Sequence, residues 1–427
     1  MALTKSTIAV LLVLPMIAGN EARQAGPGLT VHEWGTLTSV AAADGSPEDW
    51  DALGGEYDLP SFVNNGGYRC TKWRLSGTMR METPVIYFYS QRQLDARVKV
   101  QFPHGVITEW YPNAEDVIYE SKTLMDQMSR SMQSPMYSED AVFQTASLIK
   151  PAPRGLGELV VKLSASRNGI DTSLGRLMSA ITWNDIHVRP ESTAQFLIEK
   201  GPSRYYAARE TDAAPITVGN QQEKFLFYRG VGRFAIPLSA RLSGDGKIVV
   251  ENHGTDAIPS MILFENRGGH LGYRKVGAIQ QEAVTLDRPS LDGSLSRLLA
   301  DLENELVAQG LFRKEAHAMV ETWRDSWFEE GSRLIYIVPS RAVDAALPLQ
   351  VDPIPEKTSR VFVGRMELIT AETKRAVEEA VQKGDWTAIP YERFLDPILK
   401  RIYSGNTWKV NQVEQSIQAS ISPGRCR

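Results

Sequence analysis

Residues 97–111 read RVKVQFPHGVITEWY, and this stretch decides the class of fold. Apolar and polar side chains alternate strictly over residues 97–102, which predicts a strand. Pro103, His104 and Gly105 predict a turn, and the apolar and aromatic residues at 106–111 predict a second strand. The stretch therefore predicts a β-hairpin within a β-rich protein.

The flanking segments extend the β pattern. Residues 29–34 alternate well enough for a half-buried strand, and residues 83–89 are β-branched and aromatic. Residues 40–68 are rich in Gly, Asp, Ser and Asn and predict a long loop. Residues 116–132 are compatible with a helix, and residues 134–157 with an irregular surface insertion.

Strand patterns return after residue 176. Six short segments carry them: 180–183, 185–188, 224–231, 234–242, 247–251 and 260–265. Residues 243–246 (SGDG) predict a tight turn between two of these strands, and residues 266–270 (NRGGH) predict another turn. Short strands and turns at this spacing are typical of a β-sandwich.

The pattern changes to helices after Pro289. Leucines recur at helical spacing between 295 and 306, with Ser294 as the expected N-cap and Gly310 as the stop. The remaining predicted elements are a helix at 313–330, a strand at 333–338, a proline-marked connector, a strand at 359–368, and helices at 370–383 and 391–403. Thr370 caps the first of the last two helices, and Gly384 ends it.

These patterns predict an α+β protein, in which antiparallel β-sandwich-like domains precede a C-terminal helical and mixed α/β region. The 427 residues and the hydrophobic content of 42% are ample for packed cores. The expected divisions are a signal peptide (1–19), an N-terminal β domain (27–112), an irregular or helical insertion (113–175), a β-sandwich-like domain (176–287) and a C-terminal α/β region (288–427).

The first residues predict export. Lys5 precedes an apolar stretch at 8–18, which ends in Ala18 and Gly19. This is the signal-peptide pattern, and the stretch is shorter than the ~20 apolar residues of a membrane span. A buried N-terminal helix is the alternative. We expect cleavage after Gly19 and an extracytoplasmic location, in the periplasm or the medium, with no transmembrane anchor in the mature chain. The net charge of −4 gives no reason to expect nucleic acid as a partner.

Cys70 and Cys426 are the two cysteines. In an exported protein two cysteines can form one disulfide, which here would tie the C-terminus to the N-terminal domain. Two free thiols or an intermolecular bond are the alternatives.

Four short motifs resemble a known family. They are VHEWGT (31–36), RMETPV (80–85), ITEWYP (107–112) and TWRDSWF (322–328). They are similar to segments of an uncharacterised family of exported bacterial proteins that open with the His-Glu-Trp-Gly-Thr segment. The resemblance covers nearly all of the mature chain. It implies export, and it assigns neither an activity nor a functional residue.

Four residues are a candidate site for a divalent metal. His32, Glu82, His104 and Glu109 all fall in the N-terminal β region, and metal sites often draw their ligands from separate strands. Glu33 cannot join His32 there without a bulge, because neighbours on a strand point to opposite faces. The alternative is that these are ordinary strand and turn residues. The His-Glu-x-x-His motif of zinc proteases is absent from the sequence, and no other cofactor is assignable.

Two further pairs are candidate functional residues. Glu210 and Asp212 lie on the same side of an extended chain, and glycoside hydrolysis requires such a pair of carboxylates. The adjacent Arg209 could tune the pKa of one of them. A solvated strand end is the alternative. Trp323 and Trp327 lie four residues apart and could form an aromatic platform for sugars. Alternatively, they pack against a sheet, as a core-facing helix requires.

No catalytic motif stands out in the sequence. A Gly-x-Ser-x-Gly segment and a phosphate-binding glycine loop are both absent, and Arg80, Glu82 and Arg333 lie beside apolar strands, where charges often pair across sheets. The sequence therefore favours an exported, non-catalytic module for ligand binding or assembly, with an unknown extracytoplasmic ligand or protein as partner. Such a module should expose an apolar or aromatic patch. The alternative is an extracytoplasmic hydrolase, metal-assisted or glycan-directed.

Overall fold

The computed structural model describes a large part of the chain. The described residues are 25–53, 58–65, 76–121, 177–201, 203–234, 236–384, 391–406, 408–410, 412–414 and 416. The predicted signal peptide, the predicted insertion at 134–157, Cys70 and Cys426 lie outside these ranges. The export and disulfide predictions therefore stay predictions.

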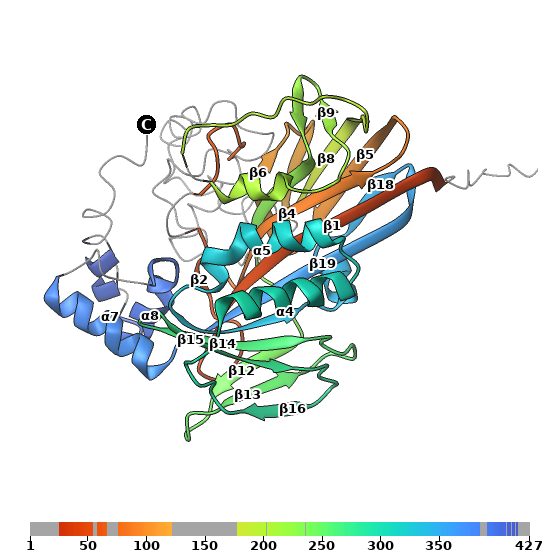
Figure 1. Cartoon of the computed structure of the whole chain (residues 1–427). Coiled ribbons are helices and arrows are strands. Elements are labelled where there is room, and N and C mark those ends of the chain that lie inside the picture. The colour runs from red at the N-terminus through yellow and green to blue at the C-terminus, as the bar shows by residue number, and fades with distance from the viewer. Residues whose placement is uncertain are drawn as a thin grey trace, which may run out of the picture.

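An eight-stranded sheet forms the centre of the molecule, in the order β15-β14-β17-β19-β1-β4-β11-β6 (Figure 1). All neighbours in it are antiparallel except β1 and β19, which run parallel. In chain order its strands are β1 (Ala25–Ala41), β4 (Met79–Tyr89), β6 (Gly105–Tyr111), β11 (Phe225–Gly232), β14 (Met261–Arg267), β15 (His270–Val276), β17 (Gly331–Ile337) and β19 (Ile354–Leu368). The sheet thus takes strands from the N-terminal, central and C-terminal ranges of the chain.

A six-stranded sheet packs on one face of the central sheet. Its strands are β5 (Leu94–Phe102), β7 (Asp116–Ser121), β8 (Leu177–Val188), β9 (Ile216–Val218), β10 (Gln221–Glu223) and β18 (Leu349–Asp352). Smaller sheets are formed by β12 (Leu238–Leu242), β13 (Ile248–Asn252) and β16 (Ala283–Leu286), and by β2 (Trp50–Asp51) and β3 (Ser76–Gly77).

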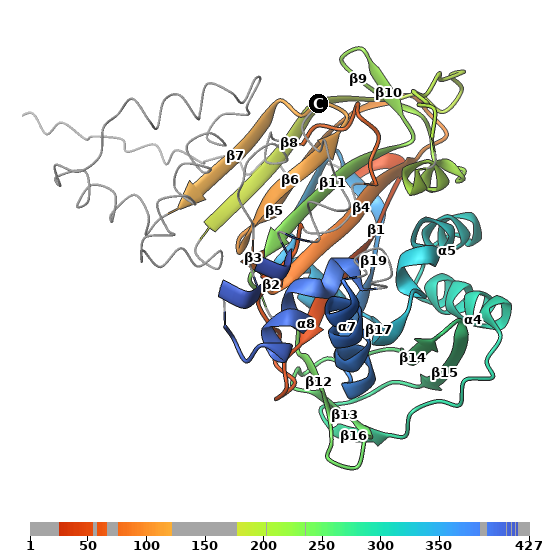
Figure 2. The ribbon, with the colours of Figure 1, turned by 90° about the vertical axis from the view of Figure 1, so that its left-hand side faces the viewer.

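Helices cover the other face and one end of the central sheet. Figure 2 shows α4 (Leu295–Ala308) and α5 (Arg313–Trp327) on the side opposite β5 and β8. The short helix η4 (Arg204–Arg209) lies against α5. The described chain also forms α6 (Ser340–Ala346), α7 (Ala371–Lys383), η6 (Glu392–Phe394) and α8 (Leu395–Ile402).

The central strands are buried on both faces, and their residue pattern shows why. In β4, Ile86 and Phe88 face the six-stranded sheet, while Val85 and Tyr87 pack under α4 and α5. Apolar residues at successive positions supply both cores, because neighbouring side chains on a strand point to opposite faces. The prediction that 29–34 is half-buried is therefore wrong, since this part of β1 lies between the two cores.

The predicted hairpin at 97–111 is also wrong, although both of its strands exist. β5 pairs with β8 and β18, whereas β6 pairs with β11. The turn at 103–104 carries the chain from one sheet to the other. Phe102 fills the corner: a Cβ on Gly105 would lie 2.3 Å from its ring, and a Cβ on Gly232 2.7 Å from it. The alternation predicted the strands, but it could not reveal their partners.

Among the other local predictions, one helix is wrong at its start and three helix ends are confirmed. Residues 116–121 form β7, which pairs with β8, so the start of the predicted helix at 116–132 is a strand. The N-caps at Ser294 and Thr370 are confirmed, because each side chain accepts a backbone N–H from the first turn. Gly384 ends α7 in the left-handed conformation, with φ of 64°. The α+β, sandwich-like fold class is confirmed, with helices concentrated toward the C-terminus.

Candidate functional site

The four residues predicted to bind a metal have separate partners. Nδ1 of the buried His32 donates to Oε2 of Glu315 at 2.7 Å, and Glu82 pairs with Arg393. His104 lies in the exposed corner between β5 and β6, and Glu109 accepts a hydrogen bond from Thr108. Within the described ranges, no three His, Cys, Asp or Glu side chains form a group that could hold a metal ion. The structure therefore gives the metal site no support.

The two carboxylates proposed for glycoside hydrolysis are exposed. Asp212 pairs with Lys314 at 2.5 Å, and both side chains are mostly solvent-accessible. Arg209 pairs with neither carboxylate, because its side chain turns inward and pairs with the buried Glu223 at 2.6 Å. Glu210 and Asp212 therefore lie in a solvent-exposed segment, as the alternative interpretation expects.

Trp323 and Trp327 form no sugar platform. Their exposed fractions are 1% and 0%, and they pack with Phe264 and Ile335 in the core between α5 and the central sheet. The alternative interpretation, that they pack against a sheet, is correct.

His32 has a structural role at the start of α5. Its partner Glu315 also accepts the backbone N–H of Phe312 at 2.7 Å, which satisfies a free donor at the helix start. The His32 ring stacks on Phe312, with ring centroids 4.5 Å apart. Together these contacts attach β1 to α5. Nε2 of His32 is buried without a hydrogen-bond partner, and no nucleophile adjoins it among the described contacts.

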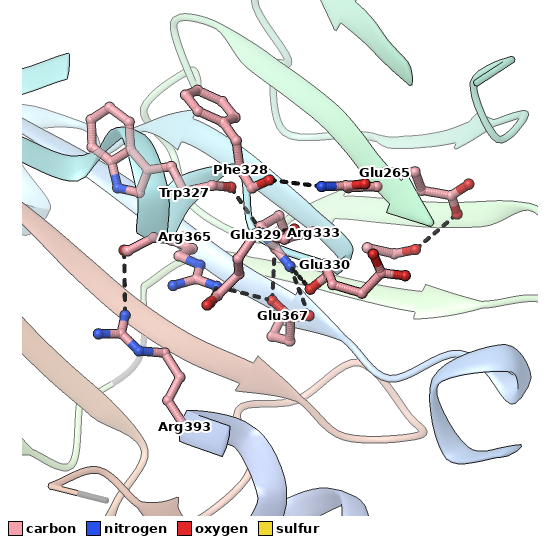
Figure 3. Close-up of polar contacts among 12 residues, drawn as sticks. Glu265, Trp327, Phe328, Glu329, Glu330, Arg333, Arg365, Glu367 and Arg393 are labelled. Carbon is pink, nitrogen blue, oxygen red and sulfur yellow. Dashed lines mark hydrogen bonds and ion pairs between the residues drawn. The ribbon is translucent and has the colours of Figure 1, made fainter. Parts of the chain in front are cut away.

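A cluster of buried arginines and carboxylates lies where α5 ends on the sheet (Figure 3). Arg333 pairs across the strands with Glu367 at 2.9 Å. Its guanidinium also donates to three backbone carbonyls at the end of α5, those of Trp327, Glu329 and Glu330. The expectation that Arg333 pairs across a sheet is confirmed.

Gly331 makes room for this pair. Its φ is +125°, and a Cβ there would lie 2.6 Å from both Nη2 of Arg333 and Oε1 of Glu367. A larger residue would displace the ion pair, and the left-handed φ would strain its backbone.

The cluster continues to the C-terminal helices. Nη2 of Arg365 donates to Glu329 at 2.5 Å, and its guanidinium lies 4.8 Å from the ring centroid of Phe394. Arg393, from η6, lies 3.3 Å from Glu82 on β4. We call Glu82, Glu329, Arg333, Arg365, Glu367 and Arg393 the arginine cluster. It joins α5, β4, β17, β19 and η6.

Burial and charge act against each other in this cluster. Burial alone would raise the pKa of Glu82, but the guanidiniums of Arg393 and Arg80 outweigh it and hold the pKa at about 2. Burial prevails at Glu367, whose pKa is raised in spite of Arg333. Each of the six members of the arginine cluster pairs with an oppositely charged member, so we assign the cluster a structural role.

The Glu82 pair should make stability depend on pH. The pKa of Glu82 is about 2 in the folded protein, against an ordinary value of 4.5. The stability contributed by the ionised carboxylate is therefore complete above pH 4.5 and is lost as the pH falls toward 2. The unfolding free energy of the wild type should fall as the pH is lowered through this window. In Glu82→Gln the slope of that fall should be smaller, by up to about 1.4 kcal/mol per pH unit. Urea unfolding at several pH values measures it, with the exposed Glu191→Gln as control. Equal slopes in wild type and Glu82→Gln would contradict the assignment.

A pocket of about 310 Å³ lies at another part of the sheet, where β1 and β19 end. Its walls are the alanines at 41–43, where β1 ends, Ala240 and Leu242 of β12, and Leu368 and Ile369 at the end of β19. Ala371 and Lys374 of α7 and Arg401 of α8 complete it. We call this the terminal pocket. Figure 2 shows α7, α8 and β12 at this end of the molecule.

The terminal pocket is apolar with a basic rim. Eight of its ten lining residues are Ala, Leu or Ile, the other two are Lys374 and Arg401, and none is acidic. Its volume is at the lower end of the ~300–1,000 Å³ usual for small-molecule sites. Arg401 already pairs with Glu48 at 2.6 Å and donates to the carbonyl of Ala41. The arrangement can hold a small apolar molecule, and its lining residues include neither a carboxylate nor an imidazole.

Sequence reasoning missed both the pocket and most of the cluster. Lys374 and Arg401 lie on helices far along the chain from Ala41, and single alanines carry no functional pattern. No sequence motif marks Arg365 or Arg393, so only the fold shows that they belong to one cluster.

Comparisons with known proteins give no family for this chain. No family model and no curated protein matches it. Two solved structures show a distant similarity: the yeast delta-COP-I mu-homology domain complexed with Dsl1 WxWxV peptide, at a TM-score of 0.25, and the same yeast domain alone, at 0.23. Each is 8% identical and covers 80% of this chain and 96% of its own. Similarity at this level carries no argument about fold or function.

None of the helices in the described ranges combines the length and the apolar run needed to span a bilayer.

Proposed function

We propose that this chain is an exported, non-catalytic protein that binds a small ligand in the terminal pocket. The observation that carries the proposal is the pocket itself, which has apolar walls, a basic rim and a volume of about 310 Å³. The predicted signal peptide supports an extracytoplasmic site of action, in the periplasm or the medium. The predicted hydrolase is the alternative, but no contact of the described residues favours it.

The described part of the surface gives a protein partner less support than the pocket gives a small ligand. The large apolar side chains exposed in the described ranges are Ile118, Leu197, Ile198, Phe312, Ile354 and Trp408. Leu197 and Ile198 are the only two of these that adjoin in sequence. A protein-binding face usually presents a larger contiguous apolar patch.

Filling the pocket should weaken binding. Ala43 lines the pocket and is exposed, so Ala43→Trp can occupy the mouth without disturbing a core. We expect the neutral fluorophore N-phenyl-1-naphthylamine to bind the wild type saturably at one site, and Ala43→Trp to weaken binding at least about tenfold.

The matched control is Ala345→Trp, at an exposed position on α6. It should bind the fluorophore like the wild type. Thermal unfolding of both variants checks that they fold. Failure of the wild type to bind, or equal binding by wild type and Ala43→Trp, would overturn the proposed function.

A further inference from the structure

The half-buried Lys374 is the group in the terminal pocket that lacks an acidic partner. It forms no ion pair and no side-chain hydrogen bond with the described residues. The other cation of the rim, Arg401, pairs with Glu48 at 2.6 Å. Lysine side chains bury their aliphatic stem and keep the charged head accessible, so the Lys374 ammonium at the rim is available to a ligand. Lys374 therefore gives the pocket an unbalanced positive charge.

The position of Lys374 on α7 increases this imbalance. α7 begins at Ala371, so Lys374 lies in its first turn, where the partial positive charge of the helix end disfavours a cation and favours an anion. Glu372 in the same turn does not compensate, because it pairs with Arg288 at 3.3 Å. An anion in the pocket would meet both the ammonium and the helix end.

The rest of the pocket requires an apolar body. Ala240, Leu242 and Leu368 form a wall without hydrogen-bonding side chains, and none of the lining residues is acidic. A fully hydrated ion such as phosphate would leave this wall uncovered, and a cationic ligand would be repelled by Lys374, which has no acidic partner among the described residues. The chemistry that fits is one negative charge on a short apolar chain.

We infer that the terminal pocket binds a small amphiphilic anion, with its carboxylate on Lys374 and its apolar body against the alanine and leucine wall. The inference rests on the proposed function, because it names the ligand class of the same pocket. It goes further in assigning Lys374 as the residue that selects charge.

Three ligands of equal length and different charge test the inference. Octanoate, octan-1-ol and octylamine are titrated into the full mature protein by displacement of N-phenyl-1-naphthylamine. We expect octanoate to bind about tenfold or more tighter than octan-1-ol, because a hydrogen bond to a charged group is gained, and octylamine to bind most weakly.

Substitutions at Lys374 separate charge recognition from packing. Lys374→Met keeps the length of the side chain and should reduce the affinity for octanoate to that for octan-1-ol, with octan-1-ol itself unaffected. Lys374→Arg should retain the preference for octanoate. Lys383→Met, which removes an exposed lysine at the other end of α7, is the matched control and should behave like the wild type.

The outcomes separate the two proposals. If octan-1-ol binds as tightly as octanoate, or if Lys374→Met leaves the preference for octanoate unchanged, charge selection by Lys374 is overturned while the pocket remains a binding site. If neither the fluorophore nor any of the three ligands binds, the proposed function fails together with the inference.

Discussion

Arg333→Met is expected to lower the free energy of unfolding by about 3–5 kcal/mol, the largest effect we foresee for a single charge. The Arg333 side chain is fully buried and pairs with Glu367. Methionine fills similar space but leaves Glu367 with Arg365, 3.5 Å away, as its remaining close cation. It also removes the donor to the carbonyls of Trp327, Glu329 and Glu330, which end α5.

A surface arginine provides the control. Arg341 is 83% exposed and lies 3.4 Å from Asp256, so Arg341→Met should change the free energy by no more than about 1 kcal/mol. Urea unfolding of both variants measures the difference. If Arg333→Met does not fold, Glu367→Gln, which keeps the shape of the side chain, replaces it. Equal effects at positions 333 and 341 would show that the arginine cluster does not stabilise the fold.

Trp327→Ala is expected to lower the free energy of unfolding by a similar amount, about 3–5 kcal/mol, because apolar packing is lost. Its side chain is fully buried against the central sheet, and its ring centroid lies 6.3 Å from that of Phe328. Alanine would leave a cavity that the paired strands beneath cannot close. Trp408, 69% exposed, is the matched control, and Trp408→Ala should change the unfolding free energy by less than about 0.5 kcal/mol.

The same pair of variants tests the rejected sugar platform. If Trp327 bound glycans, Trp327→Ala would reduce binding to soluble oligosaccharides while leaving stability nearly unchanged. Loss of stability without any change in oligosaccharide binding is the result we expect.

The sequence predicted the helices and strands better than it predicted which strands pair with one another. Ser294, Thr370 and Gly384 mark helix ends through local hydrogen bonds, so they could be read from the sequence alone. Strand pairing depends on residues far apart, and β5 and β6 show the limit: their alternation is the same whether they pair with one another or with strands of two different sheets. The sequence did not predict β15, because this strand has little apolar content and directly follows a turn.

The candidate site was less predictable than the fold. His32 and Glu82 were singled out as titratable residues in a β region, but their partners, Glu315 and Arg393, come from helices that the sequence could not place beside them. The terminal pocket arises because two strands end at the same level and leave space beside α7. Such a space depends on where the backbone stops, and a residue pattern does not record it.

The parallel pairing of β1 with β19 determines when the central sheet can be completed. Glu33 and Arg360, which pair across these strands, are 327 residues apart. During synthesis β1 emerges first, and its partner emerges after every other strand of the described chain. Until then one edge of β1 has no neighbour, and an unpaired apolar strand edge is a site of aggregation. Closing so long a loop is also slow. Truncation before residue 354 would therefore split the sheet at its centre rather than trim its border.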